Sequence, residues 1–98
     1  MKTFMMIYRG GEVPEAERED NIAALWSWLD GIREGGHEKV RFAGEGRVTV
    51  ARDEVQPYKG DVFGMSLIEA DSLEAAISLT ADWPELPYGG KIDILEAL

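Results

Sequence analysis

Residues 61–77 read DVFGMSLIEADSLEAAI, an apolar strand that runs directly into an amphipathic helix. Residues 61–69 have apolar side chains in both alternating sets, so both faces of this strand are expected to be covered. The apolar residues are Val62, Phe63, Met65, Leu67 and Ile68. Asp71 or Ser72 opens the helix, because Asp71 with Glu74 three residues later fits a capping arrangement. Trp83-Pro84 is expected to stop it.

The same two-faced pattern begins the chain. In residues 2–9, Phe4, Met6 and Tyr8 form one alternating set and Met5 and Ile7 the other. This predicts a second strand that is covered on both sides.

A helix is predicted between the acidic connection at residues 10–20 and Gly35-Gly36, where glycine ends helices readily. Its apolar residues fall on a single stripe with helical spacing. They are Ile22, Leu25, Trp26, Leu29 and Ile32. The stripe places Trp26 in the core, and it leaves Trp28 exposed unless a partner or loop covers it.

Three further strands complete the predicted sheet. Residues 39–51 alternate polar and apolar side chains around a turn at residues 43–46, which predicts a half-exposed hairpin. Residues 52–60 are expected to be a loop, and residues 91–95 a last strand. Without the extra hairpin strand the order is βαββαβ, which is typical of ferredoxin-like α+β domains. Residues 1–98 should therefore form one domain, with an antiparallel sheet and both helices on one of its faces.

The second face of this sheet would be bare in a monomer. Two of its strands are apolar on that face as well, and soluble monomers rarely expose a large apolar patch. Face-to-face pairing of two copies would cover the patch by symmetry. We therefore expect a homodimer.

Several segments resemble the YCII-related (DGPF-domain) family. They are residues 1–8, residues 46–50 (GRVTV), residues 61–77 and the ending P…YGGKIDI at residues 84–94. The resemblance implies a dimeric α/β barrel. Some YCII-type members carry a His–Asp pair in a cleft beside the sheet, with the histidine early in the first helix. Here the matching residues 18–22 read REDNI, and residues 53–57 read DEVQP in place of the DGPF motif. The resemblance therefore implies fold and assembly for this chain but no reaction.

Composition and charge limit the kinds of partner and site that the protein can have. The chain has 10 basic and 19 acidic residues, a net charge of −9, which disfavours nucleic acid and anionic membranes. It has no cysteine, hence no disulfide, thiolate nucleophile or cysteine-based zinc site. No segment has the length of a membrane span or the pattern of a signal peptide, so a cytoplasmic protein is expected. No metal or dinucleotide motif is present, and no cofactor is expected.

Candidate binding residues follow from chemistry rather than from a motif. A cleft at the end of the sheet would need apolar and aromatic walls. The candidate lining residues are Tyr8, Trp28, Tyr58, Phe63 and Met65, with core or dimer contacts as the alternative role. Arg9, Arg52 and Lys59 are candidate anion-binding residues, with surface charge as their alternative.

His37 is the only histidine and thus the obvious general base. It follows a helix stop and precedes a half-exposed hairpin, so we expect it at the surface and assign no catalytic residue. The sequence then favours a dimeric small-molecule-binding or structural domain without catalysis. The alternative is a cleft enzyme that acts on a small aromatic or carbonyl compound by acid–base chemistry. A pocket shared by His37 and a carboxylate would favour the enzyme.

Overall fold

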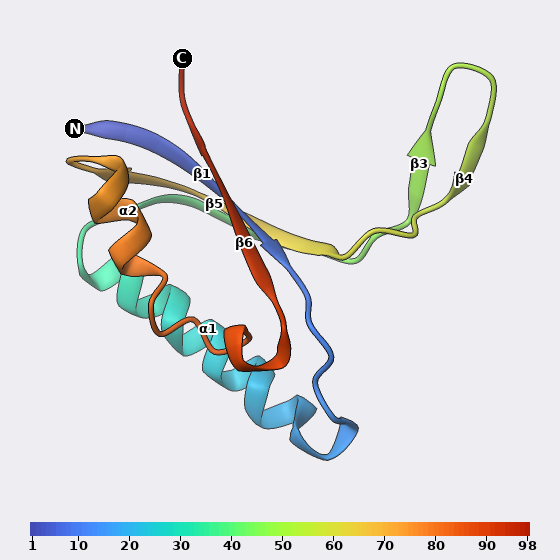
Figure 1. Ribbon diagram of the computed structural model, residues 1–98, viewed down its shortest axis with the longest axis horizontal. Helices are drawn as coiled ribbons and strands as arrows, with labels where there is room; N and C mark the ends of the chain where they lie inside the picture. Colours follow the sequence, from blue (N-terminus) through green and yellow to red (C-terminus); the bar gives the residue numbers. More distant parts are fainter.

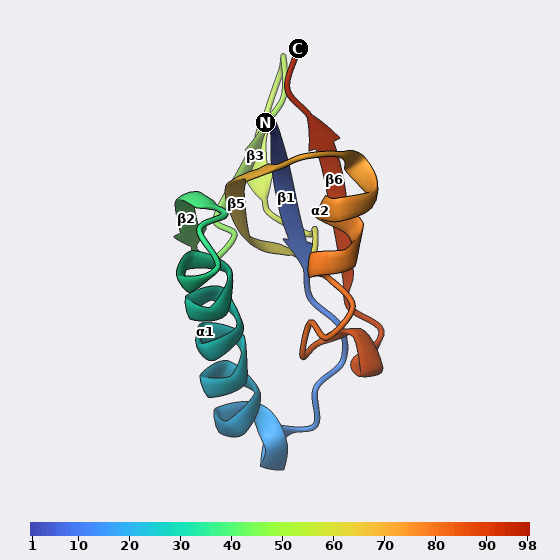
Figure 2. The same cartoon turned by 90° about the vertical axis from the view of Figure 1, so that its left-hand side faces the viewer.

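An antiparallel sheet of four strands carries both helices on one face in the computed structural model, which describes residues 1–98 (Figures 1 and 2). The sheet order is β2-β5-β1-β6. Its strands are β1 (Lys2–Arg9), β2 (Glu38–Ala43), β5 (Val62–Ala70) and β6 (Lys91–Glu96). The helices are α1 (Arg18–Glu34) and α2 (Leu73–Leu79), with short 3-10 turns η1 (Glu15–Glu17) and η2 (Leu86–Tyr88). The strands with two apolar faces, β1 and β5, are the central pair of this sheet. No helix is long and apolar enough to cross a membrane.

The core lies between the sheet and the helices. Every second residue of β1 and β5 points into it and is buried. The buried apolar residues are Phe4, Met6, Tyr8, Trp28, Ile32, Ile68, Ala70, Ala76 and Trp83. The opposite set, including Met5, Ile7, Met65 and Leu67, is only half-buried because no element of the chain covers that face. We call this second face the open face.

The predicted hairpin over residues 39–51 is wrong in its pairing. β2 pairs with β5, with Val40 opposite Leu67 and Phe42 opposite Met65. The next strand, β3 (Val48–Val50), instead pairs with β4 (Val55–Pro57), which lies in the segment expected to be a loop. β5 spans nine residues and can pair along the length of β2, whereas β3 spans only three. Val40 and Phe42 nevertheless stay exposed, at 48% and 61%. Removing β3 and β4 still leaves βαββαβ, so the ferredoxin-like order is confirmed.

The rotation of α1 about its axis also differs from the prediction. Trp28 is buried with 9% exposure, whereas Trp26 is 45% exposed, so the expected roles of the two residues are reversed. The Trp28 indole N–H donates to Asp82 Oδ1 at 3.1 Å. A buried indole needs such a partner, and Asp82 supplies it on the segment after α2. The inward stripe contains Asn21 in place of Ile22.

Helix α2 begins after Ser72, whose Oγ accepts a hydrogen bond from Ala75 N at 3.1 Å. Ser72, rather than Asp71, is therefore the N-cap. The helix ends at Leu79, before the expected stop at Trp83-Pro84, because the following residues turn Trp83 into the core.

Candidate functional site

The five predicted lining residues divide between the two faces of the sheet. Tyr58, Phe63 and Met65 line a cavity of about 580 Å³ on the open face. Tyr8 lies on the helix face, in the core, and Trp28 lines a groove between α1 and the segment that follows α2. The structure therefore brings Tyr58, Phe63 and Met65 together in that cavity, while Tyr8 contacts Trp28 and Phe63 in an aromatic cluster on the helix face.

On the helix face, Tyr8 is the centre of an aromatic cluster. Its ring stacks on Trp83 with a centroid distance of 5.6 Å and meets Trp28 edge-on at 5.9 Å. Phe63 stacks on Trp83 at 6.1 Å and so joins the same cluster. Burial raises the pKa of Tyr8 to about 12 even though the hydrogen bond to Ser66 lowers it. The phenol is therefore neutral at ordinary pH, and it donates to Ser66 Oγ at 2.8 Å.

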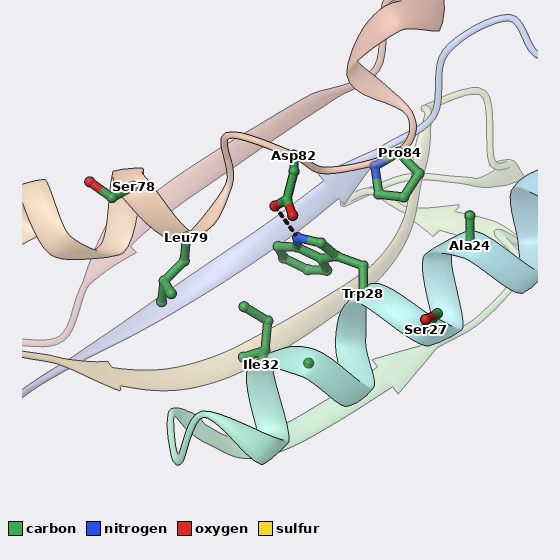
Figure 3. A pocket seen from close by; sticks show the side chains of 9 residues that line it. Ala24, Ser27, Trp28, Ile32, Ser78, Leu79, Asp82 and Pro84 are labelled. Carbon is green, nitrogen blue, oxygen red and sulfur yellow. Dashed lines mark hydrogen bonds between the residues drawn. The ribbon is translucent and has the colours of Figure 1, made fainter.

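The groove beside Trp28 has a volume of about 580 Å³ (Figure 3). Small residues of α1 form one wall and Leu79, Asp82 and Pro84 form the other. Asp82, the one ionisable residue of the lining, points to the indole of Trp28 and is already hydrogen-bonded to it (Figure 3). The groove could therefore enclose a ligand, but its one ionisable side chain is already engaged in a hydrogen bond to Trp28.

A smaller cavity on the helix side has a volume of about 260 Å³. We call it the Glu85 cavity. It lies where the start of α1, the β1–α1 connection and the segment after α2 meet. Its lining includes Gly10, Gly11, Arg18, Asn21, Phe63 and Glu85.

Glu85 is the central polar group of this cavity and is only 6% exposed. Its Oε1 accepts a hydrogen bond from Asn21 Nδ2 at 2.8 Å, and its Oε2 accepts one from Gly11 N at 3.3 Å. Gly11 must be glycine here, since a Cβ would overlap the carbonyl of Tyr88. A carboxylate has about four acceptor positions, so two donors leave it able to accept more hydrogen bonds.

The cavity therefore combines an acceptor, a cation and an aromatic wall. Glu85 can accept from hydroxyl groups, and the guanidinium of Arg18 can attract a negatively charged oxygen. Phe63 contributes a ring to the lining. Sequence reasoning did not identify Asn21 or Glu85 as site residues. The one signal for Asn21 was its place in the segment that matches the histidine of YCII-type proteins, and Glu85 is one of many acidic residues with no spacing pattern.

The three candidate anion-binding residues lie apart. Arg9 forms ion pairs with Asp61 at 3.0 Å and with Asp93 at 3.5 Å. The hydrogen bond to Asp61 raises the pKa of Arg9 and lowers the pKa of Asp61. Arg52 and Lys59 are exposed in the segment between β2 and β5, and neither forms an ion pair. No common anion site results from this placement.

His37 is partly buried, and its Nδ1 lies 2.9 Å from the carbonyl oxygen of Glu69. Because a carbonyl only accepts hydrogen bonds, this contact places the proton on Nδ1. His37 lines none of the cavities described above. The arrangement that would favour a histidine-based enzyme, a pocket shared with a carboxylate, is not found.

Comparison with known proteins gives a family and a fold. No curated protein matches the chain. The solved structure of 5-chloro-2-hydroxyhydroquinone dehydrochlorinase from Burkholderia phenoliruptrix AC1100, in complex with 2,5-dihydroxybenzoquinone, is similar with a TM-score of 0.62. The likeness covers 97% of this chain and 93% of that one at 20% identity, so it shows the shared fold alone. The family model of the YCII-related domain matches residues 1–95, and the chain therefore belongs to the YCII-related domain family.

Proposed function

We propose that this protein is a homodimeric domain that binds a small ring compound with hydroxyl or carbonyl groups in the Glu85 cavity. The observation that carries the proposal is the buried carboxylate of Glu85 in the wall of that cavity. Burying a charge costs several kcal/mol unless hydrogen bonds satisfy it. Asn21 and Gly11 supply two such bonds, and the hydroxyl groups of a ligand would supply more.

The size of the cavity supports a single-ring ligand. At about 260 Å³ it is slightly below the range of roughly 300–1,000 Å³ that is usual for larger ligands. The Phe63 ring suits a flat molecule, and Arg18 suits an enolate or phenolate oxygen. The dehydrochlorinase of similar fold was solved with 2,5-dihydroxybenzoquinone, a compound of this class.

The homodimer is supported by the open face. Half-buried Met5, Ile7, Met65 and Leu67 continue there into more exposed apolar residues. Those residues are Val40, Phe42, Val62 and Leu95, which are 39–61% exposed. Sedimentation of the wild type should give twice the 10.9 kDa mass of the chain. Met65→Asp should split the dimer, since a buried unpaired charge costs several kcal/mol.

The binding proposal can be tested by thermal shift with 2,5-dihydroxybenzoquinone and related hydroxylated rings, followed by calorimetric titration of the best compound. Glu85→Gln keeps the shape of the side chain but removes its charge. Hydrogen bonds to charged groups contribute about 1.5–3 kcal/mol, so affinity should fall roughly 10- to 150-fold. Glu17→Gln, at an exposed position just before α1, is the matched control and should bind as the wild type does. The proposal is wrong if no compound binds, or if Glu85→Gln binds as tightly as the wild type.

A second function, acid–base catalysis on the same class of compound, is favoured by one feature of the cavity. The carboxylate of Glu85 faces the ligand space and could accept a proton from a bound ring. Spectroscopic assay of proton exchange or elimination on the bound compound separates the two functions. An enzyme would lose turnover in Glu85→Gln far beyond its loss of affinity, whereas a binding domain would show no turnover in the wild type.

A further inference from the structure

Two neighbouring glycines, Gly10 and Gly11, line the Glu85 cavity where the connection from β1 to α1 passes beside η2 (Figure 2). Neither has a positive φ, so the backbone conformation does not require glycine at either position. The reason for the missing side chains must then lie in the space around each Cβ position, and this space differs between the two glycines.

Gly11 is explained by packing. A Cβ there would overlap the carbonyl oxygen of Tyr88 and the backbone nitrogen of Gly90. Glu12 N donates to Tyr88 O at 2.9 Å in the same contact, so the two segments cannot separate without losing this hydrogen bond. The fold itself therefore requires glycine at position 11.

Gly10 is not explained in this way. The atoms nearest to its Cβ position are Glu85 Oε2 and Phe63 Cδ1, both at 3.6 Å, and Asp61 O at 3.7 Å. These are ordinary van der Waals distances, so an alanine would fit without strain. Glycine costs conformational entropy on folding, and alanine at such a position stabilises a protein. The fold therefore gives no reason for glycine at position 10.

The Cβ position of Gly10 lies beside the two groups that the proposed ligand would contact. One is the carboxylate of Glu85, the acceptor for a ligand hydroxyl, and the other is the ring of Phe63. A hydroxyl that donates to Oε2 lies about 2.7 Å from it. A substituent on the neighbouring ring carbon then lies beside the carboxylate as well, where the bare Cα of Gly10 leaves room for it.

The space beside Gly10 continues beyond the Glu85 cavity. A second hollow, of about 420 Å³, shares Gly10, Gly11 and Phe63 with that cavity. Two residues without side chains and one aromatic ring thus lie between the two spaces. The backbone is held in place there, since Gly10 N donates to Asp61 O at 2.7 Å. The room at this point therefore depends on whether residue 10 carries a side chain.

We propose that Gly10 determines which ring compounds the Glu85 cavity accepts, and that it favours rings in which the hydroxyl bound by Glu85 has a methyl-sized substituent on the neighbouring carbon. This inference rests on the binding function proposed above and adds the substitution pattern of the ligand. Gly10 acts only through the space that it leaves. A methyl group on residue 10 should therefore compete with a methyl group on the ring.

The test compares hydroquinone with 2,5-dimethylhydroquinone, in which each hydroxyl has a methyl group on one neighbouring carbon. Calorimetric titration under argon, which keeps both compounds reduced, gives the ratio of their dissociation constants. The wild type should bind the dimethyl compound at least about threefold more tightly than hydroquinone, because one methyl group is buried on binding.

Gly10→Ala should reverse this preference. Its methyl group occupies the space of the ligand methyl, and such overpacking should weaken binding of the dimethyl compound, relative to hydroquinone, at least about tenfold from the wild-type ratio. Gly31→Ala, in α1 with open space around its Cβ position, is the matched control and should keep the wild-type ratio. An equal change of the ratio in both variants would overturn the inference.

Thermal unfolding without ligand tests the premise. Gly10→Ala should melt at or above the Tm of the wild type, because its Cβ meets no atom closer than 3.6 Å. Gly11→Ala should melt lower, because its Cβ would overlap Tyr88. If Gly10→Ala melts as low as Gly11→Ala, the fold requires glycine at position 10 and the inference is wrong.

The binding outcomes separate this inference from the proposed function. If both compounds bind with the same ratio in the wild type and in Gly10→Ala, the inference is wrong and the proposed function stands. A wild type that binds the dimethyl compound more weakly than hydroquinone also overturns the inference, whether or not the variant folds. A wild type that binds neither compound overturns it too, and the proposed function is wrong as well if no other hydroxylated ring binds.

Discussion

The hydrogen bond between Tyr8 and Ser66 makes a measurable contribution to stability. The two oxygens are 2.8 Å apart, and both residues are buried, at 3% and 0% exposure. Tyr8→Phe removes the donor and leaves the Ser66 hydroxyl without it. Loss of one partner of a buried hydrogen bond costs about 1–3 kcal/mol. In a domain of this size, each kcal/mol corresponds to a fall in Tm of roughly 4–8 °C.

The same substitution should change how stability depends on pH. The pKa of Tyr8 is about 12 in the folded chain and 10.0 in the reference state without burial. Between these values the unfolded chain loses the Tyr8 proton while the folded chain keeps it, so stability falls as pH rises. The stabilisation is fully present below pH 10 and is lost as pH rises to 12, a change of about 2–3 kcal/mol at 1.36 kcal/mol per pH unit. Tyr8→Phe has no such proton to lose.

Urea unfolding at pH 8, 10 and 11, at one protein concentration, measures both effects. Wild type, Tyr8→Phe, Ser66→Ala and the double variant form a cycle that isolates the hydrogen bond. The advantage of the wild type over Tyr8→Phe should shrink from pH 10 upward. Tyr88→Phe, which removes a half-buried tyrosine outside the core, is the control and should follow the wild type. A constant difference between wild type and Tyr8→Phe from pH 8 to 11 would refute the assignment of a neutral, buried Tyr8.

Other substitutions test the helices. Trp28→Ala should cost about 3–5 kcal/mol in chemical unfolding, and Trp26→Ala less than about 1 kcal/mol; equal losses would contradict the observed rotation of α1. Ser72→Ala removes the N-cap of α2 and should lower the unfolding free energy by about 1 kcal/mol, so an unchanged Tm would count against the cap. Gly31→Ala, inside α1 with open space around its Cβ position, should stabilise by about 0.5–1 kcal/mol. Gly89→Ala should destabilise, because Gly89 has a φ of 88°, which disfavours a side chain. In calorimetry, Gly31→Ala should therefore raise Tm and Gly89→Ala should lower it.

The elements that sequence analysis predicted well are those with a strong local pattern. Both alternating sets of β1 and β5 are apolar, and this local pattern predicts the two strands whatever their partners are. Strand pairing, by contrast, cannot be predicted from the local pattern. Val40 and Phe42 alternate in the same way beside any neighbour, so only the folded sheet shows that Leu67 and Met65 lie opposite them.

The candidate site was less predictable because its contacts are long-range. The apolar spacing favours Trp26 for the α1 stripe, and only the fold shows that Asp82, 54 residues beyond Trp28, provides a partner for the Trp28 indole. Glu85 and Asn21 are 64 residues apart, and neither belongs to a spacing pattern that would join them. Burial of one carboxylate among many is a tertiary property, and composition does not reveal it.

The central place of β1 in the sheet has a consequence for how the chain folds. β1 lies between β5 and β6, and its register joins Phe4 to Glu96 across almost the whole chain. Such distant pairings require large loops to close first, which slows folding. During synthesis β1 is complete long before β6 exists, so one edge of an apolar strand stays unpaired until residues 91–96 have been made. That edge can pair with other chains in the meantime. Aggregation of nascent chains should therefore depend more on the delay before β6 is made than on the final stability of the fold.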